Sequence, residues 1–159
     1  MSVVIFDIDG VFVPFYARYN PRIGFSWQEN GRKGDFLKPE MQRPWIEELS
    51  AIANLVWGSA REDANCTLEL LQIDQEWERI ELEYRDLETT PITWKLESIQ
   101  AWVADNVPDD ELLVWVDDEL QQDAFNWAVE RGNMLAVAPL KDEGLTQPQY
   151  ETIITFLKG

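Results

Sequence analysis

The chain has 159 residues, of which 45% are hydrophobic and 27% charged, and these proportions predict one folded domain with a sizeable core. Its formal net charge of −17 argues against extensive contact with nucleic-acid phosphates, because such contacts need lysine and arginine. It has no histidine, which excludes His-based catalytic triads and His-ligated zinc sites and leaves carboxylates, hydroxyls, lysine or an oxygen-bound metal for any catalysis.

Three features of the sequence bear on its cellular location. No apolar run approaches the ~20 residues that a membrane-spanning helix needs. The N-terminal apolar run is too short for a signal peptide and no basic stretch precedes it, and the single cysteine, Cys66, cannot form a disulfide within the chain. We therefore expect a cytoplasmic protein without a membrane partner.

The first predicted element is a buried parallel strand over 3–6, Val-Val-Ile-Phe. The following stretch, 11–44, is rich in proline and glycine and is expected to form a loop or flap. Residues 45–53 have helical periodicity. Their apolar face consists of Trp45, Ile46, Leu49, Ile52 and Ala53.

The segment 54–60, Asn-Leu-Val-Trp-Gly-Ser-Ala, predicts a second short strand with a sharp end. A helix is expected over about 62–71, with Leu68 and Leu71 directed inward. Residues 72–92 are ambiguous: the alternation in Arg-Ile-Glu-Leu-Glu-Tyr favours a strand, whereas the glutamate and arginine content also suits a helix.

An amphipathic helix is predicted over 93–105, with Thr93 as its N-cap. Four of its residues are expected to face inward: Trp94, Ile99, Trp102 and Val103. The remaining predicted elements are a strand at 112–116, a helix at 121–131, a strand at 134–138 and a closing helix at 147–157. Because strands and helices alternate with short connections, we predict a single α/β domain over 1–159, with a Rossmann-like parallel sheet flanked by helices.

Polar residues follow three of the predicted strands. Ligands of such folds bind beyond the carboxyl ends of the strands. Clustered carboxylates repel each other unless a cation joins them, and Mg²⁺ is the divalent ion that oxygen ligands suit best. The candidate residues are Asp7 and Asp9 after the first strand, Ser59 after the second, Asp117 and Asp118 after the third, and Lys95 at the start of the preceding helix.

These residues resemble the motifs of the haloacid dehalogenase (HAD) superfamily. Phe-Asp-Ile-Asp-Gly-Val at 6–11 is similar to its first motif, Ser59 and Lys95 fall where its second and third motifs are expected, and 114–123 resembles its fourth, acidic motif. The stretch 114–132, followed by Gly-Leu-Thr at 144–146, resembles more narrowly the small capless members associated with Swiss Army Knife RNA-repair proteins. At the second motif this chain has Gly58 and Ser59, whereas many members of the superfamily have a different small residue followed by threonine.

The resemblance implies a phosphatase that forms an aspartyl-phosphate. Asp7 is the expected nucleophile, and Asp9 the general acid that protonates the leaving oxygen and then the base that activates water. The second acid favours phosphoryl transfer, because dehalogenases of the superfamily do not use it. The expected Mg²⁺ ligands are Asp7, the backbone carbonyl of Asp9, and Asp117 and Asp118, directly or through water.

The resemblance also assigns the phosphate contacts. Ser59 and the backbone N–H groups of residues 58–60, that of Ala60 included, are expected to hold phosphate oxygens, and Lys95 to neutralise them and position Asp7. Each residue alone has a simpler interpretation: a turn for Asp7 and Asp9, a helix cap for Ser59, a surface lysine for Lys95, and a solvated loop for Asp117 and Asp118. The presence of all four motifs in the expected order along the chain favours the catalytic interpretation.

The charge of the flap points to a substrate class. Residues 11–43 hold six basic and three acidic residues, a net charge of +3, which leaves −20 for the remainder of the chain. These basic residues are interleaved with aromatic ones, a composition that suits a single-stranded nucleic-acid end. The alternative is that the aromatic residues form a small satellite core. The candidate substrate contacts are Arg18, Arg22, Trp27 and Arg32.

The sequence thus predicts a nearly capless Mg²⁺-dependent phosphatase, since neither 11–44 nor 72–92 is long enough for a full cap domain. Open sites of the superfamily tend to act on polymer ends or proteins, and by this analogy phosphorylated RNA or DNA ends are the preferred substrate class. The alternatives are small phosphate esters, phosphoproteins, or a non-catalytic binding module with this fold. Preference for 3′ or 5′ ends, the oligomeric state, and which of Asp117 and Asp118 binds the metal directly stay open.

Overall fold

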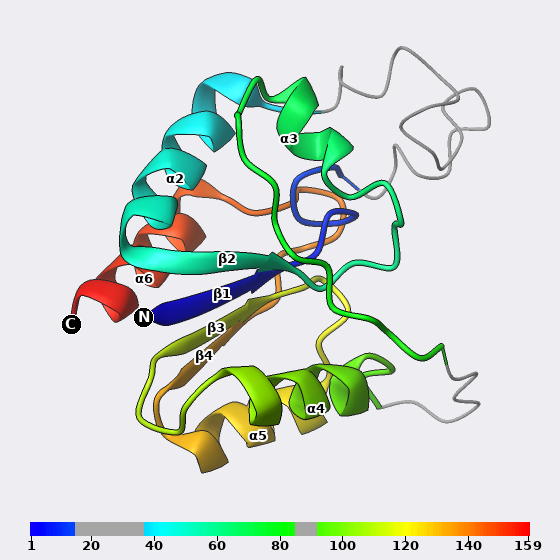
Figure 1. Ribbon diagram of the computed structural model, residues 1–159, viewed down its shortest axis with the longest axis vertical. Helices are drawn as coiled ribbons and strands as arrows, with labels where there is room; N and C mark the ends of the chain where they lie inside the picture. Colours follow the sequence, from blue (N-terminus) through cyan, green and yellow to red (C-terminus); the bar gives the residue numbers. More distant parts are fainter. Residues whose placement is uncertain (15–36, 85–91) are drawn as a thin grey trace.

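The computed structural model describes residues 1–14, 37–84 and 92–159, which form an α/β domain (Figure 1). Within these residues four parallel strands make one sheet in the order β2-β1-β3-β4. The strands are β1 (Ser2–Phe6), β2 (Ala53–Trp57), β3 (Leu113–Val116) and β4 (Met134–Val137). The predicted Rossmann-like parallel sheet is therefore confirmed.

Five helices of the described residues cover both faces of the sheet. They are α2 (Pro39–Ile52), α3 (Cys66–Leu70), α4 (Leu96–Asn106), α5 (Gln122–Arg131) and α6 (Gln147–Lys158). Helices α2, α3 and α6 lie on one side, and α4 and α5 on the other (Figure 1). None of the helices in the described ranges is both long and apolar enough to cross a membrane.

The burial of β1 on both faces explains its continuous apolar sequence. Val4 and Phe6 belong to the core beneath α2 and α6, whereas Val3 and Ile5 belong to the core beneath α4 and α5. All four side chains are buried, because successive residues of a strand point to opposite faces. The central position of β1 fixes the place of the residues that follow it.

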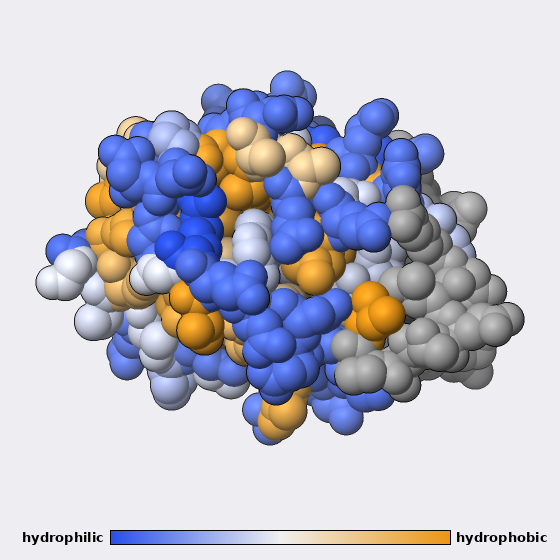
Figure 2. All heavy atoms as spheres, turned by 90° about the horizontal axis from the view of Figure 1, so that it is seen from below, coloured by the Kyte–Doolittle hydropathy of each residue, from blue (hydrophilic) through white to orange (hydrophobic). Residues whose placement is uncertain are grey.

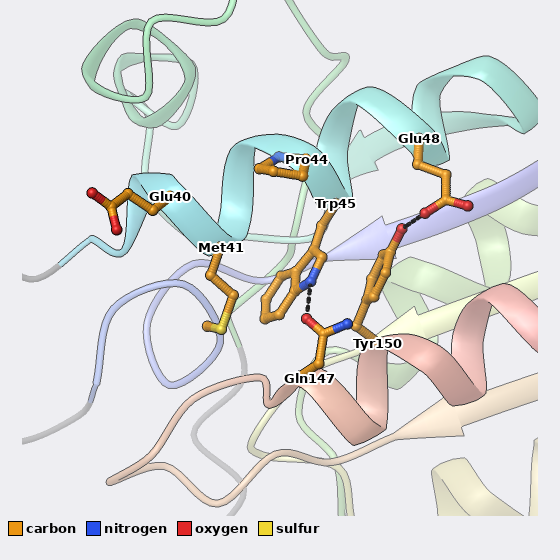
Figure 3. A pocket seen from close by; sticks show the side chains of 7 residues that line it. All are labelled: Glu40, Met41, Pro44, Trp45, Glu48, Gln147 and Tyr150. Carbon is orange, nitrogen blue, oxygen red and sulfur yellow. Dashed lines mark hydrogen bonds between the residues drawn. The ribbon is translucent and has the colours of Figure 1, made fainter.

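Helix α6 is held to α2 by a set of polar and aromatic contacts (Figure 3). The rings of Trp45 and Tyr150 stack with centroids 5.1 Å apart, and Trp45 Nε1 donates a 2.7 Å hydrogen bond to Gln147 Oε1. The Tyr150 hydroxyl donates to Glu48, which also accepts a 2.8 Å bond from Lys158 Nζ. The hollow of about 450 Å³ beside these residues is thus bordered by groups that join two helices.

Helix α2 begins at Pro39, six residues before the predicted start at Trp45. The prediction was wrong because Pro44 suggested a break, whereas it lies inside the helix. The buried side chain of Gln42 accepts a 2.9 Å bond from Lys38 N and donates a 2.9 Å bond to the carbonyl of Phe12. These bonds fix the first turn and offset the interruption that proline causes.

Two further segments refine the predicted elements. The helix expected over 62–71 is the single short helix α3, with Leu68 and Leu71 fully buried as predicted. In the ambiguous stretch 72–92, the described residues up to 84 are neither a regular strand nor a helix, but Arg79 forms one parallel bridge with Trp57. The alternating pattern therefore indicates an extended segment that pairs with the end of β2 only briefly.

The start of α4 also differs from the prediction, because Thr93 is not its N-cap. The helix begins at Leu96, and the Thr93 hydroxyl donates a 2.6 Å bond to Asp123 instead. Ile99 and Val103 are buried as expected, but the other two residues predicted to face inward, Trp94 and Trp102, are only half-buried.

Candidate active site

The sheet brings the predicted site residues together at the carboxyl ends of its strands. Asp7 N donates to the carbonyl of Val116 at 3.0 Å, and Asp117 N donates to that of Val137 at 3.1 Å. Both bonds continue the pairing of the strands by one residue. The backbone of the sheet therefore places Asp7 beside Asp117, with neither acid on a free loop.

Lys95 joins the ends of three strands from a buried position. Its Nζ lies 2.7 Å from Asp117 Oδ2, 3.2 Å from Asp7 Oδ2 and 3.0 Å from the carbonyl oxygen of Gly58. Burial opposes the charge of Lys95, but the two carboxylates outweigh it and raise the pKa of the ammonium group above its usual range. A charged lysine is thus held between the two acids.

Three carboxylates gather around this lysine. Asp7, Asp117 and Asp118 each offer an oxygen, and these oxygens all lie within 4.8 Å of one another. Burial raises the pKa of Asp7 well above its ordinary value, with further upward contributions from Asp117 and Asp9 that Lys95 opposes. Burial likewise raises the pKa of Asp118, to about 7, with the charge of Asp117 as the next cause.

This donor set fits a hard divalent cation. Oxygen ligands in a compact group are what Mg²⁺ takes in proteins, and the three carboxylates outnumber the one ammonium group beside them. Asp117 also accepts a 2.9 Å bond from Glu119 N through its other oxygen, so its carboxylate is fixed at both ends. A metal here would balance charges that burial otherwise disfavours.

Asp9 is not one of these three carboxylates and forms a bidentate ion pair with Arg61. Arg61 donates from Nε to Asp9 Oδ2 at 2.8 Å and from a terminal nitrogen to Oδ1 at 2.7 Å. Burial opposes the charge of Arg61, but the hydrogen bonds and charge of Asp9 outweigh it and raise the pKa of the guanidinium group. The expected metal contact of Asp9 is through its backbone carbonyl and stays a prediction.

Arg61 is a site residue that the sequence reasoning missed. Its position in the sequence could have identified it, because Arg61 lies two residues after Ser59, in the Ser-Ala-Arg that follows a predicted strand end. The Ser59 hydroxyl is buried and accepts a 3.2 Å bond from Arg61 N, which folds this turn back toward the strand. Ala60 between them is exposed, and its expected contact with a phosphate stays a prediction.

Gly10 allows the turn after β1 and the loop after β3 to approach closely. Its φ is +79°, a conformation that other residues adopt at a cost, and a Cβ built there would lie 2.3 Å from Asp118 Cγ. The turn is closed by a 2.7 Å bond from Gly10 N to the carbonyl of Val13. Glycine at this position therefore makes room for the Asp118 carboxylate.

The loop that carries Lys95 is tied to the loop after β3 and to the first turn of α5. Thr93 donates through its hydroxyl and its N–H to the Asp123 carboxylate, and its hydroxyl accepts a 2.8 Å bond from Gln121 N. Trp94 Nε1 donates a 2.7 Å bond to Glu119. These bonds set the position of Lys95 relative to Asp117.

The predicted substrate contacts Arg18, Arg22, Trp27 and Arg32 lie outside the described residues. Trp57, which sequence position places close to the site, is fully buried against Phe12 and Trp77 and is not available to a substrate. No family model, no curated protein and no solved structure matches this chain.

Proposed function

We propose that this protein is a Mg²⁺-dependent phosphatase of the HAD superfamily, whose motifs its sequence resembles, and that it acts through an aspartyl-phosphate at Asp7. The observation that carries the proposal is the buried ammonium group of Lys95 between Asp7 and Asp117, with an oxygen of Asp118 close by. Such a cluster adds little to stability, because desolvation of several charges offsets their attraction. Its burial at the ligand-binding edge of the sheet favours a catalytic role.

Asp7 is positioned for nucleophilic attack on phosphorus. One carboxylate oxygen forms a bond to the phosphoryl group while the bond from phosphorus to the leaving oxygen breaks, and Asp9 donates the proton that the leaving oxygen takes up. Water then attacks phosphorus, Asp9 accepts its proton, and the bond from Asp7 to phosphorus breaks. Mg²⁺, when bound by the acidic cluster, supplies positive charge to the phosphoryl oxygens.

Lys95 and Arg61 are the cations that support this chemistry. Lys95 holds the Asp7 carboxylate in place at 3.2 Å and offers its charge to the phosphoryl group that Asp7 takes up. Both oxygens of Asp9 accept bonds from Arg61, so Asp9 can exchange a proton with substrate only after this pair opens. A phosphate dianion is a competing partner for the guanidinium group, and its arrival would release Asp9.

The preferred substrate class is a phosphorylated RNA or DNA end. The support comes from the sequence: the net charge of +3 and the interleaved aromatic residues of 11–43, and intervals too short for a full cap domain. The strongly acidic remainder of the chain would repel nucleic acid elsewhere, which leaves the flap as the place of contact.

The experiment is a measurement of phosphate release from an aryl phosphate, from 3′- and 5′-phosphorylated oligonucleotides and from a phosphopeptide, each with Mg²⁺ and with EDTA. The test variant is Asp7→Asn, and the matched control is Asp142→Asn, which changes an exposed acid on another loop. We expect Mg²⁺-dependent release that Asp7→Asn abolishes and Asp142→Asn leaves unchanged, with an oligonucleotide end as the fastest substrate. Full activity of Asp7→Asn, or no release from any substrate although Mg²⁺ binds, would refute the proposal.

A further inference from the structure

A second hollow lies along the outer side of α4, between this helix and the extended segment 80–84. It has a volume of about 430 Å³. Figure 2 shows the side of the molecule that carries α4 and α5, where hydrophilic residues surround smaller hydrophobic patches. The groove is lined by Ile80, Glu81, Glu83, Trp94, Glu97, Ser98, Ala101, Trp102 and Asp105.

The floor of this groove is aromatic and its rim is acidic. Trp94 and Trp102 are both half-buried, and Trp102 packs against the core on the α4 side of the sheet. The rim holds four exposed carboxylates, those of Glu81, Glu83, Glu97 and Asp105. None of the nine described lining residues is lysine or arginine, so the lining has a formal charge of −4.

Hydrogen bonds fix the walls of the groove in the absence of a partner. Glu83 N donates a 3.0 Å bond to Ser98 Oγ, which holds the extended segment against α4. Trp94 Nε1 donates to Glu119 and Trp102 Nε1 to Glu78 at 3.2 Å, so both indole rings have set orientations. The ring of Tyr84, which is 77% exposed, lies 5.7 Å from that of Trp94 and extends the aromatic surface.

The chemistry of the groove matches the side chains of arginine and lysine. Their aliphatic stems pack on apolar and aromatic surface, while their charged groups bind carboxylates and the faces of indole rings. A nucleic-acid strand would meet four like charges, and a second copy of this acidic chain would meet the same repulsion. Charge complementarity therefore selects a basic partner.

We propose that this groove docks an extended basic segment of a partner protein, in which arginine or lysine side chains alternate with apolar ones. The carboxylates of Glu81 and Asp105 bind the cationic groups, and the tryptophan rings accept the apolar stems. The inference does not depend on the proposed phosphatase activity: of the nine lining residues only Trp94 contacts the candidate active site, through its bond to Glu119, and the test measures binding alone.

The test uses a fluorescent dodecapeptide of alternating arginine and leucine, titrated with the full chain. Glu81→Gln combined with Asp105→Asn removes two charges from the rim, and Glu130→Gln combined with Asp142→Asn removes two exposed charges elsewhere. Loss of two exposed ion pairs should weaken binding about tenfold for the rim variant. The control variant should bind like the native chain.

A second readout locates the peptide on the surface. The chain has eight tryptophans, and their indole N–H signals in NMR spectra can be assigned with single Trp→Phe variants. We expect the signals of Trp94 and Trp102 to shift on titration while that of the buried Trp57 stays in place. Equal weakening by both double variants would overturn the proposal. So would shifts confined to other tryptophans, the same shifts with a single-stranded oligonucleotide, or self-association that the rim variant abolishes.

Discussion

At the scale of single residues, Gly10 shows how closely the turn after β1 packs against Asp118. Its backbone adopts φ +79°, and the space where a Cβ would stand is occupied by the Asp118 carboxylate. Gly132 has nearly the same φ, +81°, but open space around the position of a Cβ. Both glycines therefore need a left-handed backbone, but a methyl group would displace the Asp118 carboxylate only at Gly10.

We predict that Gly10→Ala weakens Mg²⁺ binding at least ~10-fold, because the new methyl group pushes Asp118 out of the acidic cluster. Gly132→Ala should lower the free energy of unfolding by about 1–2 kcal/mol, for the left-handed backbone alone, and leave Mg²⁺ binding intact. Isothermal titration calorimetry measures the Mg²⁺ affinity of the two variants, and urea denaturation measures their free energies of unfolding. Equal Mg²⁺ affinities for the two variants would show that Asp118 does not need the space above Gly10.

Arg61 is a second residue whose contacts depend on its exact side-chain chemistry. Its planar guanidinium group holds both oxygens of Asp9, a geometry that lysine cannot reproduce. We predict that Arg61→Lys lowers kcat/KM for an aryl phosphate about 10²-fold, because lysine cannot give the arriving phosphate the bidentate contact that releases Asp9, the proposed proton-transfer group. Arg131→Lys, which alters an ion pair with Asp109, is the matched control and should leave the kinetics unchanged. A loss of stability in Arg61→Lys with unchanged kinetics would mean that Arg61 only anchors its loop.

At the scale of elements, α6 is fastened to α2 by contacts that involve no predicted site residue. Glu48 accepts bonds from Tyr150 and Lys158, and these two bonds, that of Lys158 first, lower the pKa of Glu48. Trp45 stacks on Tyr150 from the same helix as Glu48. The closing helix is thus held through one acidic and one aromatic residue of α2 (Figure 3).

We predict that Tyr150→Phe lowers the free energy of unfolding by about 1 kcal/mol, because the ring stays stacked while one hydrogen bond is lost. Tyr84→Phe makes the same change at an exposed ring and should have no effect on stability. Urea denaturation of the two variants gives the comparison. If both variants unfold like the native chain, the hydroxyl bond to Glu48 contributes nothing to the attachment of α6.

The elements that sequence patterns predicted well are those whose burial is periodic. The apolar runs of β1 and β3 and the heptad-like face of α2 show in the residue types, so their existence and order could be predicted. The start of α2 could not, because Gln42 stabilises it through the distant carbonyl of Phe12. Thr93 was mistaken for a cap because its true partner, Asp123, lies thirty residues further along the chain.

The residues of the candidate site also divide into those that sequence patterns predicted and those that depend on distant contacts. Asp7 and Asp117 could be expected together because the strand ends of a parallel sheet meet at one edge, and Lys95 with them because its helix begins at that edge. The pairing of Asp9 with Arg61 and the groove beside α4 depend on side-chain positions across the fold, which no local pattern in the sequence specifies.

At the scale of the whole molecule, the acidic cluster links stability to pH. Burial raises the pKa of Asp118 from 3.8 to about 7, so between these values the folded chain binds more protons than the unfolded one. The free energy of unfolding of the Mg²⁺-free protein should therefore decrease as pH rises through this range. The raised pKa values of Asp7 and Asp117 act in the same direction.

We predict that Asp118→Asn makes this decrease in stability with pH less steep, whereas the exposed control Asp142→Asn leaves it unchanged. Saturating Mg²⁺ should flatten the profile of the native chain, because the cation takes over the role of the protons. Thermal denaturation from pH 4 to pH 7, in EDTA and in Mg²⁺, provides the profiles. A native profile that Mg²⁺ does not alter would argue against a metal site at this cluster.

The most direct test of the central claim is to identify the residue that carries the phosphoryl group. The protein is mixed with an aryl phosphate and Mg²⁺, quenched during turnover and treated with borohydride, which reduces an acyl phosphate to an alcohol. Peptide mass spectrometry then locates the reduced side chain. The account predicts reduction at Asp7 alone, absent without substrate and absent in Asp7→Asn. Turnover with no reduced residue, or with reduction at a different acid, would contradict it.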